Sequence, residues 1–306
     1  MVLLILGGEY FVESSVSLAS HLKVPRILIG TTLVSLATTA PELAVSVRAS
    51  WLGQPELALG NAVGSAIANI ALILGLLCVL RPMAVHAWEF RLPSWVMLGL
   101  GALLMVLTSP LWVGRGAGIG LLLCGATYLT VDYVRHRRHG TRDADDAEAA
   151  VGILSLPKSI VLFVFGACMV IGGGELLCTH GAALARHLGV PPLIVGLTMV
   201  AFGTSVPELV TMLHAARKGV PDLSLGNVVG ANILNLTLVT GSAATIRPLV
   251  LPSRMHHLYS FGAMVFIFVL LKVMAHTGPQ RLTRREGCVL IGAYVVYLVG
   301  LLTFRL

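Results

Sequence analysis

Residues 30–43 read GTTLVSLATTAPEL, and the chain repeats this stretch as GLTMVAFGTSVPEL at residues 196–209. The similarity extends beyond these motifs: residues 7–82 align with residues 173–248 without a gap, and 31 of the 76 aligned pairs are identical. Each copy continues into a second motif, GNAVGSAIANI in the first and GNVVGANILNL in the second. The chain therefore contains two related halves.

The repeat lies in a strongly apolar chain. Of its 306 residues, 56% are hydrophobic and only 11% are charged, whereas ordinary soluble domains carry about 25% charged residues. Apolar runs long enough to cross the roughly 30 Å hydrocarbon core as helices recur along its length. The composition predicts an all-α polytopic membrane protein with the lipid bilayer as its surroundings.

Turn and charge signals between the apolar runs predict ten transmembrane helices. We place them at residues 1–20, 27–50, 57–80, 92–109, 116–134, 158–181, 192–216, 223–246, 257–275 and 286–304. Residues 1–134 and 158–306 then form two five-helix repeats, joined by a polar linker at residues 135–157. Because five is odd, the second repeat crosses the membrane in the opposite orientation. Inverted repeats of this kind are typical of secondary transporters, which bind substrate near the membrane midplane.

Lys and Arg are divided unevenly between the two sides of this topology. Fifteen lie on the side of the 135–157 linker and six on the other side. The positive-inside rule places the basic side in the cytoplasm and both termini outside. Because topology accounts for the net charge of +7, nucleic acid is not an expected partner. The five cysteines form no CxxC pair, which favours free thiols over a zinc site.

The repeated motifs align polar side chains on single helix faces. Ser35, Thr38, Thr39 and Glu42 stand at i, i+3, i+4 and i+7 of the second predicted span. The seventh span repeats this spacing with Ala201, Thr204, Ser205 and Glu208. The third span adds Ser65 and Asn69, and the eighth span adds Ala231 and Asn235.

Each copy also places a proline directly before its glutamate. Pro41 and Pro207 each remove one backbone hydrogen bond and are expected to free the carbonyls of Ala37 and Gly203. Such groups are tolerated at membrane depth where a helix lines a cavity or a binding site. An ionised glutamate at the bilayer centre costs at least about 2.5–3.5 kcal/mol. Two glutamates at equivalent positions therefore indicate function rather than simple helix kinks.

The chemistry of these side chains favours a hard cation. Hydroxyl, carboxamide, carboxylate and carbonyl oxygens suit Ca²⁺ or Na⁺, and no thiol or imidazole joins the pattern. The sequence contains no HExxH or GxSxG motif, so no enzymatic activity is expected. Asn61 and Asn227, in the GN pair of each second motif, are expected to support the site or to bond freed backbone.

The paired segments resemble the two α-repeats of the calcium/cation antiporter superfamily, most closely its prokaryotic sodium/calcium exchanger branch. The repeats correspond to residues 30–75 and 196–241, and the resemblance covers nearly the whole chain. It implies Na⁺/Ca²⁺ antiport by alternating access in a prokaryotic cytoplasmic (inner) membrane, with no cofactor besides the transported ions. The implied ligands are Ser35, Thr38, Thr39, Glu42, Ser65, Asn69, Ala201 through its backbone carbonyl, Thr204, Ser205, Glu208, Ala231 and Asn235.

The chain departs from the family pattern at several positions. Ala66 stands where asparagine is usual, and Ala231 removes a hydroxyl. Asn235 replaces an aspartate found in some relatives, which leaves two carboxylates and weakens the case for K⁺ cotransport. The proton-coupled branch typically has a further acidic residue where this chain has Gly64 and Gly230. An H⁺/Ca²⁺ antiporter of the same fold remains the alternative. The oligomeric state is open, with a monomer as one expectation.

Overall fold

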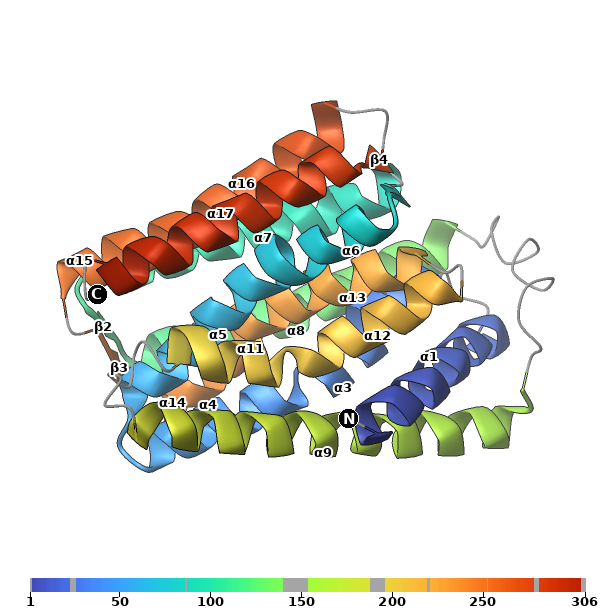
Figure 1. Cartoon of the computed structure of the whole chain (residues 1–306), viewed down its shortest axis with the longest axis horizontal. Helices are drawn as coiled ribbons and strands as arrows, with labels where there is room; N and C mark the ends of the chain where they lie inside the picture. Colours follow the sequence, from blue (N-terminus) through green and yellow to red (C-terminus); the bar gives the residue numbers. More distant parts are fainter. Residues whose placement is uncertain are drawn as a thin grey trace.

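The computed structural model describes residues 2–22, 26–85, 87–139, 154–187, 196–218, 221–251, 253–277 and 281–303. Nearly all of them are helical, and Figure 1 shows the helices packed in layers. The π-helical segments carry the letter η. The helices are α1 (Val2–Leu22), α2 (Arg26–Ile29), η1 (Gly30–Val34), α3 (Ser35–Thr38), α4 (Ala40–Trp51), α5 (Pro55–Ile67), η2 (Ala68–Leu74), α6 (Gly75–Leu80), α7 (Ala87–Leu107), α8 (Arg115–His139), α9 (Leu156–His187), η4 (Gly196–Val200), α11 (Ala201–Thr204), α12 (Val206–Arg217), α13 (Pro221–Leu234), η5 (Asn235–Val239), α14 (Thr240–Ile246), α15 (Arg254–His256), η6 (His257–Phe261), α16 (Gly262–Thr277) and α17 (Arg284–Thr303).

Each of the ten predicted ranges is helical over most of its described residues. Residues 192–195 of the seventh range and residues 140–153 of the predicted linker lie outside the described residues. The start of that linker is helical, because α8 continues to His139. The two motif-bearing ranges of each half are subdivided by π-helical segments, with η1 matching η4 and η2 matching η5. Such segments are frequent at functional sites, where they redirect side chains and backbone groups.

Six helical segments within the described residues are long and apolar enough to cross a membrane. They are Pro55–Leu80, Phe90–Leu107, Arg115–Arg135, Leu223–Ile246, Arg254–His276 and Arg284–Thr303. Two of them are central, because 78% of the apolar window is buried in the first and 94% in the fourth. Only 28–44% is buried in the other four, which expose apolar side chains as lipid-facing helices do. The protein is therefore a membrane protein built around two enclosed helices, and the count of ten spans stays a prediction.

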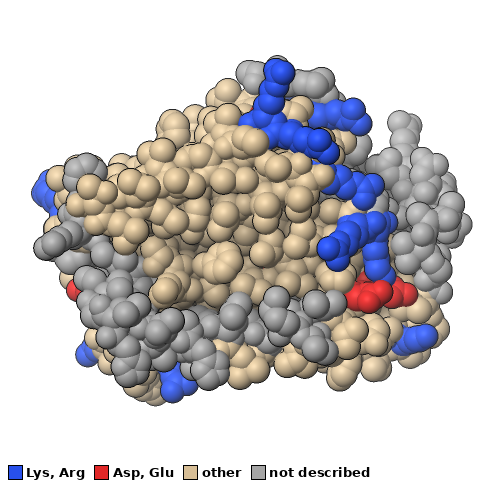
Figure 2. All heavy atoms as spheres, in the orientation of Figure 1, with Lys and Arg blue, Asp and Glu red and all other residues tan. Residues whose placement is uncertain are grey.

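A broad band of the visible surface carries no charged side chains. Figure 2 shows many of the visible Lys and Arg side chains along the edge where β4 lies in Figure 1, beside a wide surface without charge. An uncharged band beside a basic rim is the distribution expected of a protein that spans a bilayer.

Two short strand pairs, which the sequence did not predict, join the halves. β1 (Met83–Ala84) pairs antiparallel with β4 (Arg281–Leu282), and β2 (Trp112–Val113) pairs antiparallel with β3 (Leu249–Val250). In each pair, one strand comes from the first half of the chain and the other from the second. The two pairs lie at opposite ends of the molecule (Figure 1).

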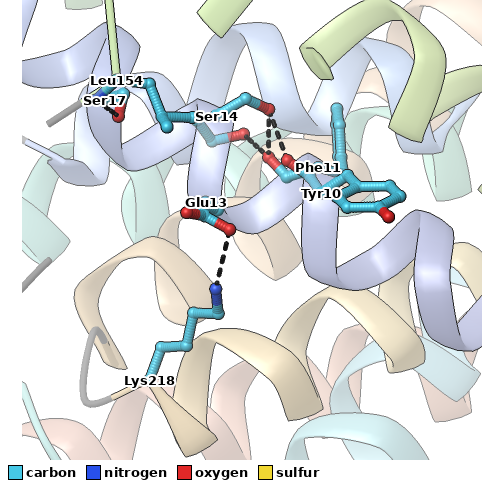
Figure 3. A network of polar contacts seen from close by, with 8 residues as sticks. Tyr10, Phe11, Glu13, Ser14, Ser17, Leu154 and Lys218 are labelled. Carbon is cyan, nitrogen blue, oxygen red and sulfur yellow. Dashed lines mark hydrogen bonds and ion pairs between the residues drawn. The ribbon is translucent and has the colours of Figure 1, made fainter. Parts of the chain in front are cut away.

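Helices α1 and α9 pack along each other at one side of the helix stack (Figure 1). A small apolar cluster that includes Phe11 and Val12 connects α1 to Ala215 of α12. Figure 3 shows the polar contacts of the same helix: Lys218 Nζ lies 3.3 Å from Glu13 Oε2, and the Leu154 N–H donates to Ser17 Oγ over 3.1 Å. Helix α1 therefore contacts the rest of the protein through apolar and polar side chains.

Candidate functional site

Two glycines let the halves approach each other at the centre of the protein. A Cβ on Gly64 of α5 would lie 2.7 Å from the Cβ of Ala201 in α11. A Cβ on Gly230 of α13 would lie 2.7 Å from Oγ of Ser35 in α3. These two contacts are equivalent under the 166-residue repeat, with the halves exchanged. The second motif of each half therefore packs against the first motif of the other half.

The helix that carries each glutamate begins after a one-residue break. Thr39 has φ −78° and ψ −2°, and Ser205 has φ −83° and ψ 3°, so the same turn occurs in both halves. The carbonyls of Ala37 and Gly203 nevertheless accept backbone N–H groups at these caps. The prediction that proline frees these two carbonyls is therefore wrong. The ψ near zero at Thr39 and Ser205 tightens the turn, so that each carbonyl accepts a shorter-range backbone hydrogen bond in place of the one that the proline removes.

Glu42 and Glu208 lie in the first turns of α4 and α12, and both are fully buried. Helix N-termini favour negative charge in this position. Ser205 Oγ donates a hydrogen bond to Glu42 Oε1 over 3.2 Å. Glu42 Oε2 and both carboxylate oxygens of Glu208 have no hydrogen-bond partner. The two carboxyl groups are close enough to interact electrostatically, so the centre holds strong acceptors that the protein itself leaves unpaired.

Asn61 hydrogen bonds to the helix that carries Glu42, and Asn61 and Asn227 each accept a hydrogen bond from a threonine of the other half. Asn61 Nδ2 donates to the backbone carbonyl of Glu42 over 3.1 Å, and Thr204 Oγ1 donates to Asn61 Oδ1 over 3.1 Å. Thr38 Oγ1 donates to Asn227 Oδ1 over 3.2 Å, which is the same threonine–asparagine contact with the halves exchanged. A threonine that donates its proton to asparagine keeps oxygen lone pairs for a cation. Asn61 therefore contacts the backbone beside Glu42, and both asparagines join the two halves; their supporting role at a cation site stays a prediction.

The remaining predicted residues of the first half are buried; some of them make hydrogen bonds and others have polar atoms without a partner. Ser65 Oγ donates to the Ala201 carbonyl over 3.3 Å and lies 3.4 Å from Thr204 Oγ1. Ser35 Oγ donates to the carbonyl of Thr31 over 2.8 Å. Thr39 Oγ1 and Asn69 Oδ1 have no hydrogen-bond partner.

The remaining predicted residues of the second half are also buried. Both amide atoms of Asn235 are buried without a hydrogen-bond partner. Ala231 is buried and supplies no side-chain oxygen. The Ala201 carbonyl, expected to be a ligand, already accepts the Ser205 N–H over 3.1 Å as well as the Ser65 hydroxyl. This carbonyl therefore already has hydrogen-bond partners within the protein.

The contacts bring most of the predicted residues together. Glu42, Ser205, Thr204, Ser65 and Ala201 form one connected group, and the hydroxyls of Thr38 and Thr39 lie near the Glu208 carboxylate without hydrogen bonds to it. Glu42 of the first group and Glu208 of the second are close enough to interact electrostatically. Within the described part of the chain, no hydrogen bond joins Asn69 or Asn235 to either group, and no three His, Cys, Asp or Glu side chains cluster. A cation here would meet two carboxylates and otherwise neutral oxygens.

The buried polar residues Asn232 and Asp132 were not singled out from the sequence. Asn232 of α13 hydrogen bonds to Asn69 over 3.1 Å. Asp132 of α8 accepts a hydrogen bond from Thr31 Oγ1 over 2.9 Å. Asp132 is an acidic residue inside an apolar run, a signal that should have drawn attention to it. Asn232 could have been found because its partner position in the repeat is Ala66, so the two copies differ there.

A largely helical apolar chain with two buried glutamates, three of whose four carboxylate oxygens lack a hydrogen-bond partner, belongs to the class of membrane cation transporters. The chain is a member of the sodium/calcium exchanger family, whose model matches residues 1–134 and 158–303, and this confirms the resemblance found in the motifs. Membership makes it a membrane protein of cation/calcium exchange, a transporter rather than an enzyme.

Three related proteins match this chain along nearly their whole length. The chain is 33% identical to the putative antiporter CaxA of Alkalimonas amylolytica, covering 97% of this chain and 94% of that protein. It is 31% identical to the sodium/calcium exchanger MaX1 of Methanosarcina acetivorans, over 98% of this chain and 96% of that one. The solved sodium-calcium exchanger NCX_Mj, soaked with Na⁺ and Sr²⁺, superposes with a TM-score of 0.82 at 28% identity, covering 97% and 94% of the two chains.

Proposed function

We propose that this protein is a Na⁺/Ca²⁺ antiporter whose cation site is built around Glu42 and Glu208. The observation that carries the proposal is the pair of fully buried carboxyl groups, with three of their four oxygens lacking a hydrogen-bond partner. Buried acceptors without partners are costly in a folded protein. A bound cation would satisfy them.

The proposed ligands are drawn from both halves and match the preference of hard cations for oxygen. Thr39, Asn69 and Asn235 support the proposal best among the neutral groups, because each has a buried oxygen without a hydrogen-bond partner. The full proposed set is Ser35, Thr38, Thr39, Glu42, Ser65, Asn69, Ala201, Thr204, Ser205, Glu208, Ala231 and Asn235. We expect Ala201 to contribute least, since its carbonyl already accepts hydrogen bonds from the Ser205 N–H and the Ser65 hydroxyl.

Charge balance gives a reason for coupled exchange. Two ionised glutamates carry a charge that one Ca²⁺ or two Na⁺ would neutralise. An empty pair of buried carboxylates would be costly while the site moves through a dry passage. Competition of Ca²⁺ and Na⁺ for the same carboxylates would therefore couple the flux of one to the opposite flux of the other, by alternating access.

The proposed architecture is ten transmembrane helices in two inverted repeats, residues 1–134 and 158–306, with the linker 135–157 in the cytoplasm. Both termini would lie outside a prokaryotic cytoplasmic membrane. The reciprocal contacts of Gly64 and Gly230 support the inverted relation, as do strand pairs at opposite ends of the molecule. The relatives include the inner membrane protein YrbG of Escherichia coli, 30% identical over 98% of this chain and 94% of that protein.

Flux measurements in liposomes test the function. Purified protein in vesicles loaded with Na⁺ should take up ⁴⁵Ca²⁺, and uptake should stop when internal and external Na⁺ are equal. Glu42→Gln and Glu208→Gln should each abolish uptake, because each removes one charge of the pair. Glu56→Gln is the matched control, since this partly exposed glutamate lies in the first turn of α5 and makes no described contact with the site. Uptake that ignores the Na⁺ gradient would contradict Na⁺ coupling.

Proton coupling is the second candidate, and the unpaired carboxylates are the observation in its favour, because they can accept H⁺ in place of Na⁺. Replacing Na⁺ by choline at a fixed pH gradient separates the two. Uptake that persists in choline and follows the pH gradient would identify H⁺/Ca²⁺ exchange.

A further inference from the structure

A buried amide chain crosses between the halves beside the proposed site. Asn232 of α13 donates from Nδ2 to the backbone carbonyl of Ala66 in α5, over 3.0 Å. Asn69 of η2 donates from its own Nδ2 to Asn232 Oδ1, over 3.1 Å. All three residues are fully buried. The second half thus makes two successive hydrogen bonds to the first half at this point.

The order of these bonds fixes which way each amide faces. A backbone carbonyl only accepts hydrogen bonds, so Asn232 must turn its nitrogen toward Ala66 and its oxygen toward Asn69. That oxygen also only accepts, so Asn69 must present its nitrogen to Asn232. The remaining Asn69 atom, Oδ1, is buried without a hydrogen-bond partner. In this orientation the Asn69 side-chain nitrogen has a hydrogen-bond acceptor, and only the side-chain oxygen lacks a hydrogen-bond partner.

The equivalent arrangement is missing on the other side of the repeat. Asn235 is the counterpart of Asn69, and the position equivalent to Asn232 is Ala66, which has no amide. Neither amide atom of Asn235 has a hydrogen-bond partner. The site therefore has one asparagine whose orientation the protein sets and one whose orientation it does not.

We propose that Asn232 is a positioning residue for cation binding, which holds Asn69 with its amide oxygen turned away as a preset donor for the cation. The inference rests on the proposed function, because it requires Asn69 to be a ligand. Asn235 has no such holder and turns its oxygen to the cation only on binding. The first-half asparagine is thereby preorganised, and the second-half asparagine is not.

A double-mutant cycle on the full-length protein tests this, with Ca²⁺ binding measured by isothermal titration calorimetry in detergent. Loss of a group that orients a metal ligand commonly weakens binding about 10- to 100-fold. We expect Asn232→Ala to raise the Ca²⁺ Kd about ten-fold in the otherwise unchanged protein. In the Asn69→Ala background the same change should alter the Kd by no more than about two-fold, because there is no longer an amide to orient.

The matched control is the same cycle with Asn235→Ala, in which the Asn232→Ala effect should remain about ten-fold, as for independent residues. An equal effect of Asn232→Ala with and without Asn69 would overturn the proposal and show a purely structural role. Asn232→Ser provides a second variant if the alanine protein folds poorly: any rise in Kd that it causes should disappear in the Asn69→Ala background, and a rise that persists there would overturn the proposal. Failure of Na⁺ coupling appears only in flux measurements, and failure of the glutamate site appears as unchanged Ca²⁺ binding by Glu42→Gln. Neither reading depends on Asn232.

Discussion

Ser205 of the second half donates a hydrogen bond to Glu42 of the first half, with 3.2 Å between Oγ and Oε1. The two residues are 163 positions apart, and both are buried. The counterpart of Ser205 in the repeat is Thr39, whose hydroxyl makes no hydrogen bond. Glu42 is thus held by a donor from the opposite half, whereas Glu208 is not.

This difference predicts unequal effects of removing the two hydroxyls. Ser205→Ala leaves Glu42 without its donor, and hydrogen bonds to charged groups contribute about 1.5–3 kcal/mol. We expect Ser205→Ala to raise the Ca²⁺ KM for uptake about ten-fold, and Thr39→Ala to raise it less. Ser205 is both a proposed ligand and the hydrogen-bond donor to Glu42, whereas Thr39 is a proposed ligand only. Uptake by both variants in the same vesicles is the measurement. A larger effect of Thr39→Ala would contradict the expected order.

Substitution of Gly64 or Gly230 by alanine should destabilise the protein, because the added Cβ interferes with the packing of its two halves. In Gly64→Ala and Gly230→Ala, the added Cβ would lie 2.6 Å from the Leu197 carbonyl and 2.7 Å from the Thr31 carbonyl, and backbone cannot rotate away. We expect a lower unfolding temperature for both variants, with a loss of at least about 1–3 kcal/mol as is typical of overpacking. Thermal unfolding in detergent is the measurement.

Gly99→Ala is the control for these variants. Gly99 lies within α7, and nothing lies within 4 Å of the Cβ that alanine would add. Alanine is favoured over glycine inside a helix by about 0.5–1 kcal/mol, so the unfolding temperature should stay the same or rise. A similar loss in all three variants would show that the close approach at the centre is not the cause.

The ion pair between Glu13 and Lys218 should contribute little to stability. Its side chains are 30% and 24% exposed, respectively, and pairs of this kind contribute about 0–1 kcal/mol. We expect Lys218→Met to lower the free energy of unfolding by less than about 1 kcal/mol, with the difference disappearing at high salt. A Glu13→Gln, Lys218→Met double-mutant cycle measures the pair directly. A larger coupling would mean that the pair shown in Figure 3 contributes more to the attachment of α1 than its exposure suggests.

The motifs were sufficient to predict the helical class and the family, and they marked Glu42 and Glu208 as equivalent buried positions. These follow from local rules: apolar run length, the spacing of polar residues along a helix, and a repeat that marks equivalent positions. The expected loss of the Ala37 and Gly203 carbonyl bonds was wrong because the effect of a proline depends on how the turn closes, and ψ values near zero allowed replacement bonds.

The sequence by itself determined which polar side chains share a helix face in each half, because helix periodicity is a local property, and the duplication showed which positions of the two halves correspond. The tertiary structure decided how those side chains are shared between the halves. Ser205 reaches Glu42, Thr38 reaches Asn227, and Asn232 reaches Asn69, each across more than 160 residues of chain. Such contacts depend on the packing of α5 and α13 at Gly64 and Gly230, and small differences between the copies break the symmetry there. A hydrogen bond needs its donor and acceptor within about 3 Å, and only the packed halves set that distance.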